Sequence, residues 1–339
     1  MHEWSVDAVY VCQLHQSHRL PQLVFISNRV DLPIRERKIW EKQKQNAYKS
    51  NVSSFGFHTI YDIHLLRIIN MARISVLMGI YNCAPTLQEA LDSLYAQTYQ
   101  DFKIILCDDG SKDDTLKIAE ENAKKHPNVV VIKNERNMGL NYTLNHCLEY
   151  ADTEYCARMD GDDISLPTRF EKEINFLDEH PEYAVVSTPM IYFDENGEFR
   201  RGKGGYAPKK KDFIYAAPHC HAPSMVRTDA YKAVDGYTVD PKLLRNEDFN
   251  LWMKMYSIGL KGYNLDECLY AMRDDREALL RRKSWKMTCN SVYSSYIAYK
   301  TLKLSIFSYI FCIKPIITYI LPTWLYNIVH KKKIRFNRK

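Results

Sequence analysis

The residues best suited to chemistry lie near the middle of the chain, in the segment MDGDDISLP at 159–167. Within it, Asp160, Asp162 and Asp163 place three carboxylates in four consecutive positions. Carboxylates this close repel one another, and each loses hydration when it is partly buried. A hard divalent cation, Mg²⁺ or Mn²⁺, prefers oxygen ligands and would relieve that repulsion. The pattern Asp160-Gly161-Asp162 therefore predicts a metal site, in which the glycine lets the backbone and a ligand approach closely.

Three further polar segments accompany this one, two of them at the ends of apolar runs and one in a loop. They are GIYN at 79–82, DDGS at 108–111 and NMGL at 137–140. Ligands of an open parallel sheet bind outside the carboxyl ends of its strands, so we expect all four segments to surround one crevice. The segments lack the glycine patterns of a dinucleotide-binding fold and of a P-loop. Aspartates do not themselves bind a diphosphate, but a metal ion that they hold can do so.

Strand and helix patterns alternate in the part of the chain that would position these segments. Apolar runs predict strands at 74–80, 103–107, 129–132 and 155–159, and helical periodicity predicts helices from about 86, from about 113, at 140–150 and at 167–179. Thr86 and Glu89 match a capping box that would open the first helix. Such alternation predicts an α/β fold with a mainly parallel sheet and right-handed crossovers. Further on, the patterns predict strands at 184–190, 224–227 and 269–272, a hairpin turn at 196–197, and helices at 229–234 and 248–258.

The net charge of +6 conceals an asymmetry along the chain. Residues 276–339 contain fourteen Lys or Arg and one acid, a net charge of +13, so residues 1–275 carry −7. Because the basic character belongs to the C-terminal segment, we do not expect a nucleic-acid-binding protein. The nine cysteines are odd in number, scattered and without a Cys-x-x-Cys pair, which favours reduced thiols in the cytoplasm. The first residues show no signal-peptide pattern, so we do not expect secretion.

The pattern changes at Met71, where a stretch without clear periodicity gives way to a buried strand. We therefore expect an N-terminal extension at 1–70, a main domain at 71–275 and a basic, amphipathic helical extension at 276–339. The most apolar part of that extension, 304–329, is interrupted by Pro315 and Pro322 and falls short of a membrane-spanning helix. Two alternatives remain open for it, a pair of helices packed on the core or a segment that binds the membrane surface.

Five segments resemble, in order and spacing, the family 2 inverting glycosyltransferases of GT-A fold. They are ISVLMGIYN, ILCDDGSKDDT, NMGLNYTLN, MDGDDISLPTRFEKE and EDFNLWMKM, and the resemblance spans about residues 72–275. It implies a mixed, mainly parallel sheet flanked by helices. It also implies a nucleotide-activated sugar donor, usually a UDP-sugar, and a divalent metal.

The resemblance also implies roles for individual residues. In the nucleotide site it places Gly79, Tyr81, Asn82, Asp109, Asn137, Gly139 and Asp160. Asp109 would accept the uracil imide N–H, Asp162 would be the direct metal ligand, and Asp160 would lie near the ribose and the metal. Asp248 and Glu247 match the catalytic-base motif. His219, His221 and Arg273 fall on the acceptor or diphosphate side, although the Tyr-x-x-x-His pattern of many relatives is missing around Arg273.

Structural roles compete with several of these assignments. The DDGS segment at 108–111 is also typical of a turn with a helix cap. For Asp163, capping of the following helix is favoured over metal ligation. For Glu247, a structural role as a first-turn acid that complements the helix dipole is as consistent with the sequence as a contact to the acceptor. The spacing of His219 and His221 fits no zinc pattern.

Together these observations predict an inverting glycosyltransferase that moves a hexose or N-acetylhexosamine from a UDP-sugar to a hydroxyl. The expected acceptor is a glycan or lipid-linked glycan in capsule or lipopolysaccharide synthesis, at the inner face of the cytoplasmic membrane. Two alternatives stay open. One is a sugar nucleotidyltransferase, which would need a glycine-rich first loop with a basic residue, and the other is a non-enzymatic adaptor at the membrane surface.

Overall fold

The structure is a computed structural model that describes residues 9–10, 25–26, 72–274 and 284–321. By internal contacts the chain divides into two compact units, 1–70 and 71–339. In the first unit the described residues form a short antiparallel pair, β1 (Val9–Tyr10) with β2 (Phe25–Ile26). The rest of the predicted N-terminal extension, and the parts of the predicted C-terminal extension at 276–283 and 322–339, lie outside the described residues.

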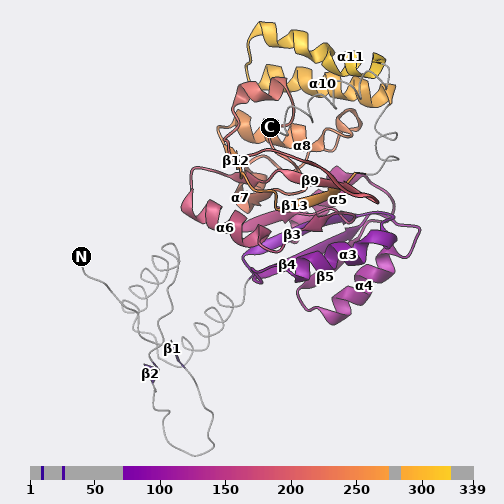
Figure 1. The fold of residues 1–339 in the computed structure, drawn as a ribbon, viewed down its shortest axis with the longest axis vertical. Coiled ribbons are helices and arrows are strands. Elements are labelled where there is room, and N and C mark those ends of the chain that lie inside the picture. Colours follow the sequence, from indigo (N-terminus) through magenta and orange to yellow (C-terminus); the bar gives the residue numbers. More distant parts are fainter. Residues whose placement is uncertain (1–8, 11–24, 27–71, 275–283, 322–339) are drawn as a thin grey trace, which may run out of the picture. The chain divides into compact units, whose positions relative to one another are not determined.

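A seven-stranded sheet forms the centre of the second unit, in the order β12-β8-β11-β6-β3-β4-β5 (Figure 1). Four of its strands are parallel neighbours, β3 (Ile74–Ile80), β4 (Phe102–Asp108), β5 (Val129–Lys133) and β6 (Tyr155–Arg158). The others are β8 (Val185–Ser187), β11 (Met225–Arg227) and β12 (Gly262–Asn264), of which β11 runs antiparallel to both of its neighbours. The predicted α/β fold with a mainly parallel central sheet is therefore confirmed.

Helices cover both faces of this sheet because side chains alternate along each strand. The helices between the parallel strands are α3 (Ala84–Tyr95), α4 (Thr115–Lys125), α5 (Leu140–Glu149) and α6 (Arg169–Glu179). On β3, Val76 and Met78 belong to one buried cluster, with α3, α4 and α6, whereas Leu77 belongs to the other, with α5 and α8 (Glu247–Ser257). The continuous apolar runs of these strands are thus explained by burial on both faces.

A second sheet of four strands, in the order β10-β9-β13-β7, lies beside the first. Its strands are β7 (Ile164–Ser165), β9 (Met190–Asp194), β10 (Gly197–Arg201) and β13 (Tyr270–Arg273). The single strand predicted at 184–190 is wrong, because the chain leaves the large sheet after β8 and enters the small one at β9. Pro189, which lacks a backbone N–H for a ladder, lies between them. The hairpin turn predicted at 196–197 is confirmed, with Gly197 at a φ of +100°.

The start of the first helix also differs from the prediction. Helix α3 begins at Ala84, with Pro85 in its first turn, and no side chain caps its N-terminus. Thr86 therefore lies inside the helix instead of at its cap, and the predicted capping box is wrong. Its hydroxyl donates to the carbonyl oxygen of Gly161 at 2.9 Å, which ties α3 to the carboxylate segment that follows β6.

The C-terminal half adds a layer of helices on the second buried cluster. Its elements are η1 (Lys210–Ile214), α7 (Thr228–Ala233), η2 (Pro241–Leu243), α8 (Glu247–Ser257), α10 (Trp285–Thr301), η3 (Ile306–Ile313) and α11 (Lys314–Ile320). Helix α10 buries Ala298 and Tyr299 in the same cluster as Leu251 and Trp252 of α8. The described part of the C-terminal extension is thus packed on the core (Figure 1). No helix within the described ranges is both long enough and apolar enough to cross a membrane.

A buried ion pair joins α6 to the end of β6. Arg169 and Glu173 are both completely buried, with 3.1 Å between Nε and Oε2. The Arg169 guanidinium also donates to the carbonyl oxygen of Arg158 at 2.9 Å, on the last residue of β6. Since β6 leads directly into the carboxylate segment, this pair fixes the strand end on which that segment depends.

We expect Arg169→Ala to lower the free energy of unfolding by about 3–5 kcal/mol, because it leaves the Glu173 carboxylate buried without its partner. Urea denaturation followed by tryptophan fluorescence measures this. Arg201→Ala is the matched control, since its pair with Glu198 is exposed and its loss should change the stability little. The double variant Arg169→Met/Glu173→Leu should be less destabilised than Arg169→Ala. Equal, small losses for Arg169→Ala and Arg201→Ala would contradict this role.

Candidate active site

The polar segments predicted to meet at one crevice do lie at one edge of the large sheet. Strands β3 and β4 pair in parallel up to Ile80 and Asp108. The segments 79–82 and 108–111, at the carboxyl ends of these strands, therefore lie side by side. The backbone N–H of Asp109 donates to the carbonyl oxygen of Ile80 at 2.9 Å. Strand β6 is the other neighbour of β3, which brings the carboxylate segment at 160–163 to the same edge.

The segment after β3 is locked to the segment after β4. Asn82 has a φ of +48°, a conformation that asparagine tolerates better than most residues. Its backbone N–H donates to the Ser111 hydroxyl at 3.0 Å, and its side-chain oxygen accepts from the N–H of Lys112 at 2.8 Å. Tyr81, next to it, keeps nearly half of its surface exposed. Asn82 therefore holds the two segments together, and the Tyr81 ring remains accessible for stacking.

Asp109 organises the loop at 137–139. Its carboxylate accepts hydrogen bonds from the backbone N–H groups of Met138 at 2.8 Å and Gly139 at 2.9 Å, and from the Asn134 amide at 2.8 Å. The predicted nucleotide-site residues Asp109, Asn137 and Gly139 are thus brought together. A carboxylate offers about four acceptor positions, so three internal bonds leave one for a ligand.

Asp108 forms the turn that the competing interpretation of this segment predicts. One of its oxygens accepts the N–H groups of Gly110 and Ser111, which shapes the turn after β4. Within the part of the chain that the structure describes, its other oxygen, Oδ1, is buried without a hydrogen-bond partner. The turn interpretation is therefore confirmed for Asp108, and the nucleotide-binding role of Asp109 stays a prediction.

The carboxylate of Asp160 forms an ion pair with a buried arginine. Arg158, only 1% exposed, donates from Nη2 to Oδ1 of Asp160 at 2.6 Å. The backbone N–H of Asp160 donates to the Tyr270 hydroxyl at 3.2 Å. The sequence motifs did not single out Arg158. The available signal was a charged residue at the end of an otherwise apolar strand, because a buried charge needs a partner.

Gly161 is required by close packing inside the protein. A Cβ atom at this position would lie 2.8 Å from the Cys83 sulfur and 3.3 Å from Cγ2 of Ile80. The carbonyl oxygen of Gly161 accepts the Thr86 hydroxyl described above. The sequence predicted that this glycine lets a ligand approach closely. The structure shows instead that a small residue is needed because Cys83, just before α3, packs against the carboxylate segment.

Asp162 and Asp163, although adjacent, have different surroundings. Desolvation and the charge of Asp160 raise the pKa of Asp162 to about 6. Asp163 is buried, and its Oδ1 accepts the backbone N–H of Arg273 at 2.8 Å, which ties the segment to β13. Asp163 does not cap α6, which begins at Arg169 after Thr168, so that prediction is wrong.

Asp160 and Asp162 are the residues that could hold a metal ion. Among the described residues, no group of three or more His, Cys, Asp or Glu side chains forms a metal site by itself. Mg²⁺ commonly binds through one or two carboxylates and takes its remaining ligands from substrate phosphates and water. The raised pKa of Asp162 reflects negative charge that such a cation would compensate. The two carboxylates therefore fit a metal that arrives with a phosphorylated substrate.

Asp248 and Glu247 lie in the first turn of α8. Oε1 of Glu247 accepts the backbone N–H of Arg245 at 2.9 Å, which closes the turn before the helix. Burial raises the pKa of Asp248 to about 6, although the backbone N–H of Phe249 donates to its Oδ1 at 2.7 Å. Desolvation thus outweighs the helix N-terminus, which alone would favour the ionised carboxylate. A carboxylate with this pKa is suited to accept a proton near neutral pH.

Of the two histidines assigned to the acceptor side, His219 is buried and His221 is partly exposed. The ring nitrogens of His219 lie 2.7 Å from Oδ1 of Asn264 and 2.9 Å from the Tyr256 hydroxyl. Burial lowers the pKa of His219 to about 4, so this ring is neutral. His221 lies 2.8 Å from the Tyr237 hydroxyl, and burial also lowers its pKa. His219 therefore joins β12 to α8, which gives it a structural role in this loop.

Arg273 is engaged by the carboxylate segment. Its Nε donates to the carbonyl oxygen of Asp162 at 3.1 Å, and its Nη2 forms an ion pair with Glu89 of α3 at 2.6 Å. The guanidinium also lies 4.7 Å from the centre of the Phe193 ring. Arg273 thus links the small sheet to the carboxylate segment and to α3.

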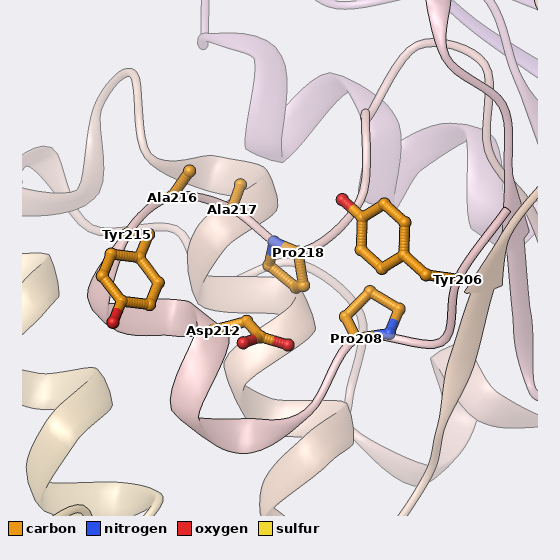
Figure 2. A pocket seen from close by; sticks show the side chains of 7 residues that line it. All are labelled: Tyr206, Pro208, Asp212, Tyr215, Ala216, Ala217 and Pro218. Atoms are coloured by element: carbon orange, nitrogen blue, oxygen red, sulfur yellow. The ribbon is translucent and has the colours of Figure 1, made fainter. Parts of the chain in front are cut away.

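A cavity of about 340 Å³ lies in the loop between β10 and β11 (Figure 2). Its lining consists of Tyr206, Pro208, Asp212, Tyr215, Ala216, Ala217 and Pro218. Figure 2 shows the two tyrosine rings on opposite sides of the cavity, with Asp212 and the prolines between them. Asp212 accepts the backbone N–H of Lys209 at 2.7 Å and so closes η1. The predicted site residues do not line this cavity.

Comparison with known proteins finds similarity along most of the described chain. The sequence model of glycosyl transferase family 2 matches residues 75–234. EpsE of Bacillus subtilis, described as a glycosyltransferase, is 39% identical over 263 residues, which cover 77% of this chain and 94% of EpsE. An Escherichia coli protein named UDP-Gal:alpha-D-GlcNAc-diphosphoundecaprenol beta-1,3-galactosyltransferase is 28% identical, over 78% of this chain and 97% of that protein.

Two solved structures share the fold at low sequence identity. TarS of S. aureus, in complex with UDP-GlcNAc, has a TM-score of 0.56 at 20% identity, over 68% of this chain and 70% of that one. The mannosyltransferase PcManGT from Pyrobaculum calidifontis, in complex with GDP-Man and Mn²⁺, has a TM-score of 0.52 at 14% identity, over 78% and 80%. These matches support the architecture of the sheet and its helices.

We expect Gly161→Ala to lower the free energy of unfolding by about 1–3 kcal/mol, because the added methyl overpacks against the Cys83 sulfur. Chemical denaturation measures the loss. Cys83→Ala removes the sulfur and should restore most of the stability when combined with Gly161→Ala. Cys83→Ala by itself is the control for the second substitution. If the double variant is as unstable as the sum of the two single variants, the proposed contact is not the cause.

Proposed function

Since the chain belongs to glycosyl transferase family 2 and is a glycosyltransferase, we propose that it moves a hexose or N-acetylhexosamine from a UDP-sugar to a hydroxyl with inversion. Membership of this family decides against the two alternatives, a sugar nucleotidyltransferase and a non-enzymatic adaptor. The observation that carries the proposal is the pair Asp160 and Asp162, held at the carboxyl end of β6 by Arg158, Thr86 and Tyr270. A rigid pair of carboxylates at this edge suits a donor that carries a diphosphate.

A uridine nucleotide fits the edge formed by β3 and β4. Tyr81 offers an accessible ring for stacking on a base, and Asp109 keeps one acceptor position for an N–H donor such as the uracil imide. Asn82, Asn137 and Gly139 belong to the segments that frame this position. The UDP and UDP-GlcNAc complexes of TarS and the UDP-Gal in the name of the Escherichia coli relative support the same donor class.

Asp162, with Asp160 beside it, would hold Mn²⁺ or Mg²⁺. When bound, the cation would stabilise the charge that develops on the departing diphosphate. The role of the protein is to keep the two carboxylates in position, through Arg158 on Asp160 and Arg273 on the backbone of Asp162. The Mn²⁺ complex of PcManGT supports the choice of metal.

Asp248 is the proposed catalytic base. Inverting transfer is a single displacement, so one carboxylate must take the proton of the acceptor hydroxyl on the face opposite the UDP. Asp248 lies on α8, separate from the loop that carries Asp160 and Asp162, and burial gives it a pKa suited to this task. Glu247 is the rival, but its carboxylate already accepts a hydrogen bond from Arg245.

The proposed acceptor is a growing glycan, free or lipid-linked, in capsule or lipopolysaccharide synthesis. The diphosphoundecaprenol acceptor in the name of the Escherichia coli relative supports a lipid-linked one. The enzyme would then act in the cytoplasm, peripherally bound to the inner face of the membrane. UDP release from a panel of UDP-sugars, with and without Mn²⁺, tests the proposed donor class and metal together.

We expect Asp162→Ala to reduce UDP release by at least about 10²-fold, because the charge of the departing diphosphate would lose several kcal/mol of stabilisation. Initial rates at saturating UDP-sugar measure this. Asp229→Ala, which removes an exposed carboxylate on α7, is the matched control and should keep the wild-type rate. Turnover near wild type in Asp162→Ala would remove this residue from the metal site.

We expect Asp248→Asn to lower kcat by about 10²–10⁴-fold with little change in UDP affinity, because only proton transfer is lost. Glu247→Gln should cost less, since the turn that Glu247 closes can form with an amide oxygen. Steady-state kinetics and calorimetry with UDP separate the two effects. The reverse ranking would assign the base to Glu247, and normal rates in both variants would exclude the mechanism.

The same assignment predicts the pH dependence of kcat. A base with a raised pKa is active when deprotonated, so kcat should fall as the pH drops below about 6. Asp162 has a pKa of about 6 without metal, but a bound cation would lower it. If the fall of kcat at acidic pH is due to protonation of Asp248, raising the Mn²⁺ concentration should leave its midpoint unchanged. A midpoint that shifts to lower pH with added metal would instead indicate titration of the metal site.

A further inference from the structure

Large apolar side chains are exposed together on η3 and α11. We define the apolar face as Ile306, Phe307, Ile310, Ile313, Ile317 and Ile320. The exposed fraction reaches 83% for Phe307 and 75% for Ile306, and it is at least 49% for each of the six. Contiguous exposed apolar surface on a folded protein is typical of a contact site, because burying it from water is favourable.

On η3 the apolar face is the outer side of an element whose inner side is packed, whereas α11 has no buried residue and contacts α10 through the rings of Tyr319 and Trp285. Ser308 and Cys312, four residues apart, are buried, whereas Ile306, Phe307 and Ile310 point away from them. Figure 1 shows α11 in the outermost layer, beyond α10, which itself packs on α8. The exposure on η3 therefore does not result from an unpacked element. It belongs to a surface that the fold presents to its surroundings.

The charges of the segment that carries the apolar face are of one sign. The segment 284–321 contains four lysines, at 286, 300, 303 and 314, and neither Asp nor Glu. Six more Lys or Arg residues follow in 331–339, whose structure lies outside the described residues. Residues 1–275, in contrast, carry a net charge of −7. An anionic surface would thus attract this end of the protein and repel the remainder.

We propose that the apolar face docks into the interface of an anionic lipid bilayer, with the surrounding lysines at the headgroups. The elements that carry it, of eight and seven residues, are too short to span a bilayer, so the face would lie within the interface. A second copy of the chain is the less favoured occupant, because the same positive charges would face one another. The apolar face would be the contact surface for the membrane partner proposed above, and its assignment rests on that proposed function.

The docking surface is connected to the acceptor side of the site. Helix α10 holds the loop before Asp248 through Asn290, whose amide donates to the carbonyl oxygen of Pro241 at 3.2 Å. Phe311 lies 6.3 Å from the ring of Tyr215, which lines the cavity in Figure 2, and Lys314 donates to the Tyr215 carbonyl oxygen. Docking would therefore fix the cavity and Asp248 with respect to the lipid surface from which a lipid-linked acceptor extends.

Co-sedimentation of the full chain with lipid vesicles tests the proposal. The probes are vesicles of phosphatidylcholine alone and of phosphatidylcholine mixed with phosphatidylglycerol, at low and at high salt. We expect binding to the anionic vesicles at low salt, and weaker binding at high salt because the charges are screened. The variant Ile306→Ser/Phe307→Ser/Ile310→Ser should reduce the partition coefficient about tenfold or more.

A matched variant controls for the loss of apolar surface in general. Phe199→Ser/Val239→Ser/Ile258→Ser removes three exposed apolar side chains that lie outside η3 and α11, and it should bind vesicles as the wild type does. Both triple variants should keep the wild-type melting temperature, because the replaced side chains are exposed. UDP release without vesicles should be unchanged in both, so that loss of docking is distinguishable from failure of the proposed enzyme activity.

Four outcomes would overturn the proposal. One is a wild-type protein that ignores anionic vesicles at low salt. Another is equal binding by the two triple variants. A third is vesicle binding that depends on the basic residues at 331–339 alone. In that case alanine variants of these residues would lose binding, whereas the apolar-face variant would keep it. The last is a wild-type dimer in sedimentation velocity that the apolar-face variant dissociates, which would assign the face to a contact between copies.

Discussion

The concentration of negative charge at the carboxyl end of β6 is the constraint around which this site is arranged. Asp160, Asp162 and Asp163 lie within four positions, and each is compensated differently. Arg158 pairs with Asp160 from the core, Asp163 accepts a backbone N–H from β13, and Asp162 keeps a raised pKa. Arg158 thus compensates Asp160, whereas burial and the neighbouring carboxylates raise the pKa of both Asp162 and Asp163. Of these two, Asp162 is the exposed one that a cation would reach.

Compensating those charges requires contacts between elements that are distant in sequence. The carboxylate segment leaves the large sheet at β6, passes through β7 and is fixed by β13 of the small sheet. Thr86 and Cys83 at the start of α3 hold the middle of the segment, and the buried Arg169 holds its beginning. The junction of the two sheets is therefore the rigid support of the site, in which ligand groups can be positioned without further reorganisation.

Helix α8 couples this site to the surface of the molecule. Its first turn carries Asp248, its middle packs on the central sheet through Leu251 and Trp252, and α10 covers its outer side. Burial raises the pKa of Asp248. The same layer bears the apolar face on η3 and α11, so the acceptor side of the site and the proposed lipid contact share one set of helices.

The sequence alone determined the alternation of strands and helices, the edge at which the polar segments meet, and the family resemblance. Those features are specified locally, as apolar periodicity and as motifs of a few residues. Only the tertiary structure decided that Asp109 holds the 137–139 loop, that Arg158 lies behind Asp160, and that His219 is a neutral core residue. It also decided which side of the apolar C-terminal segment is covered and which is exposed. Burial, hydrogen-bond partners and pKa depend on residues far away in the chain, and no local pattern specifies those neighbours.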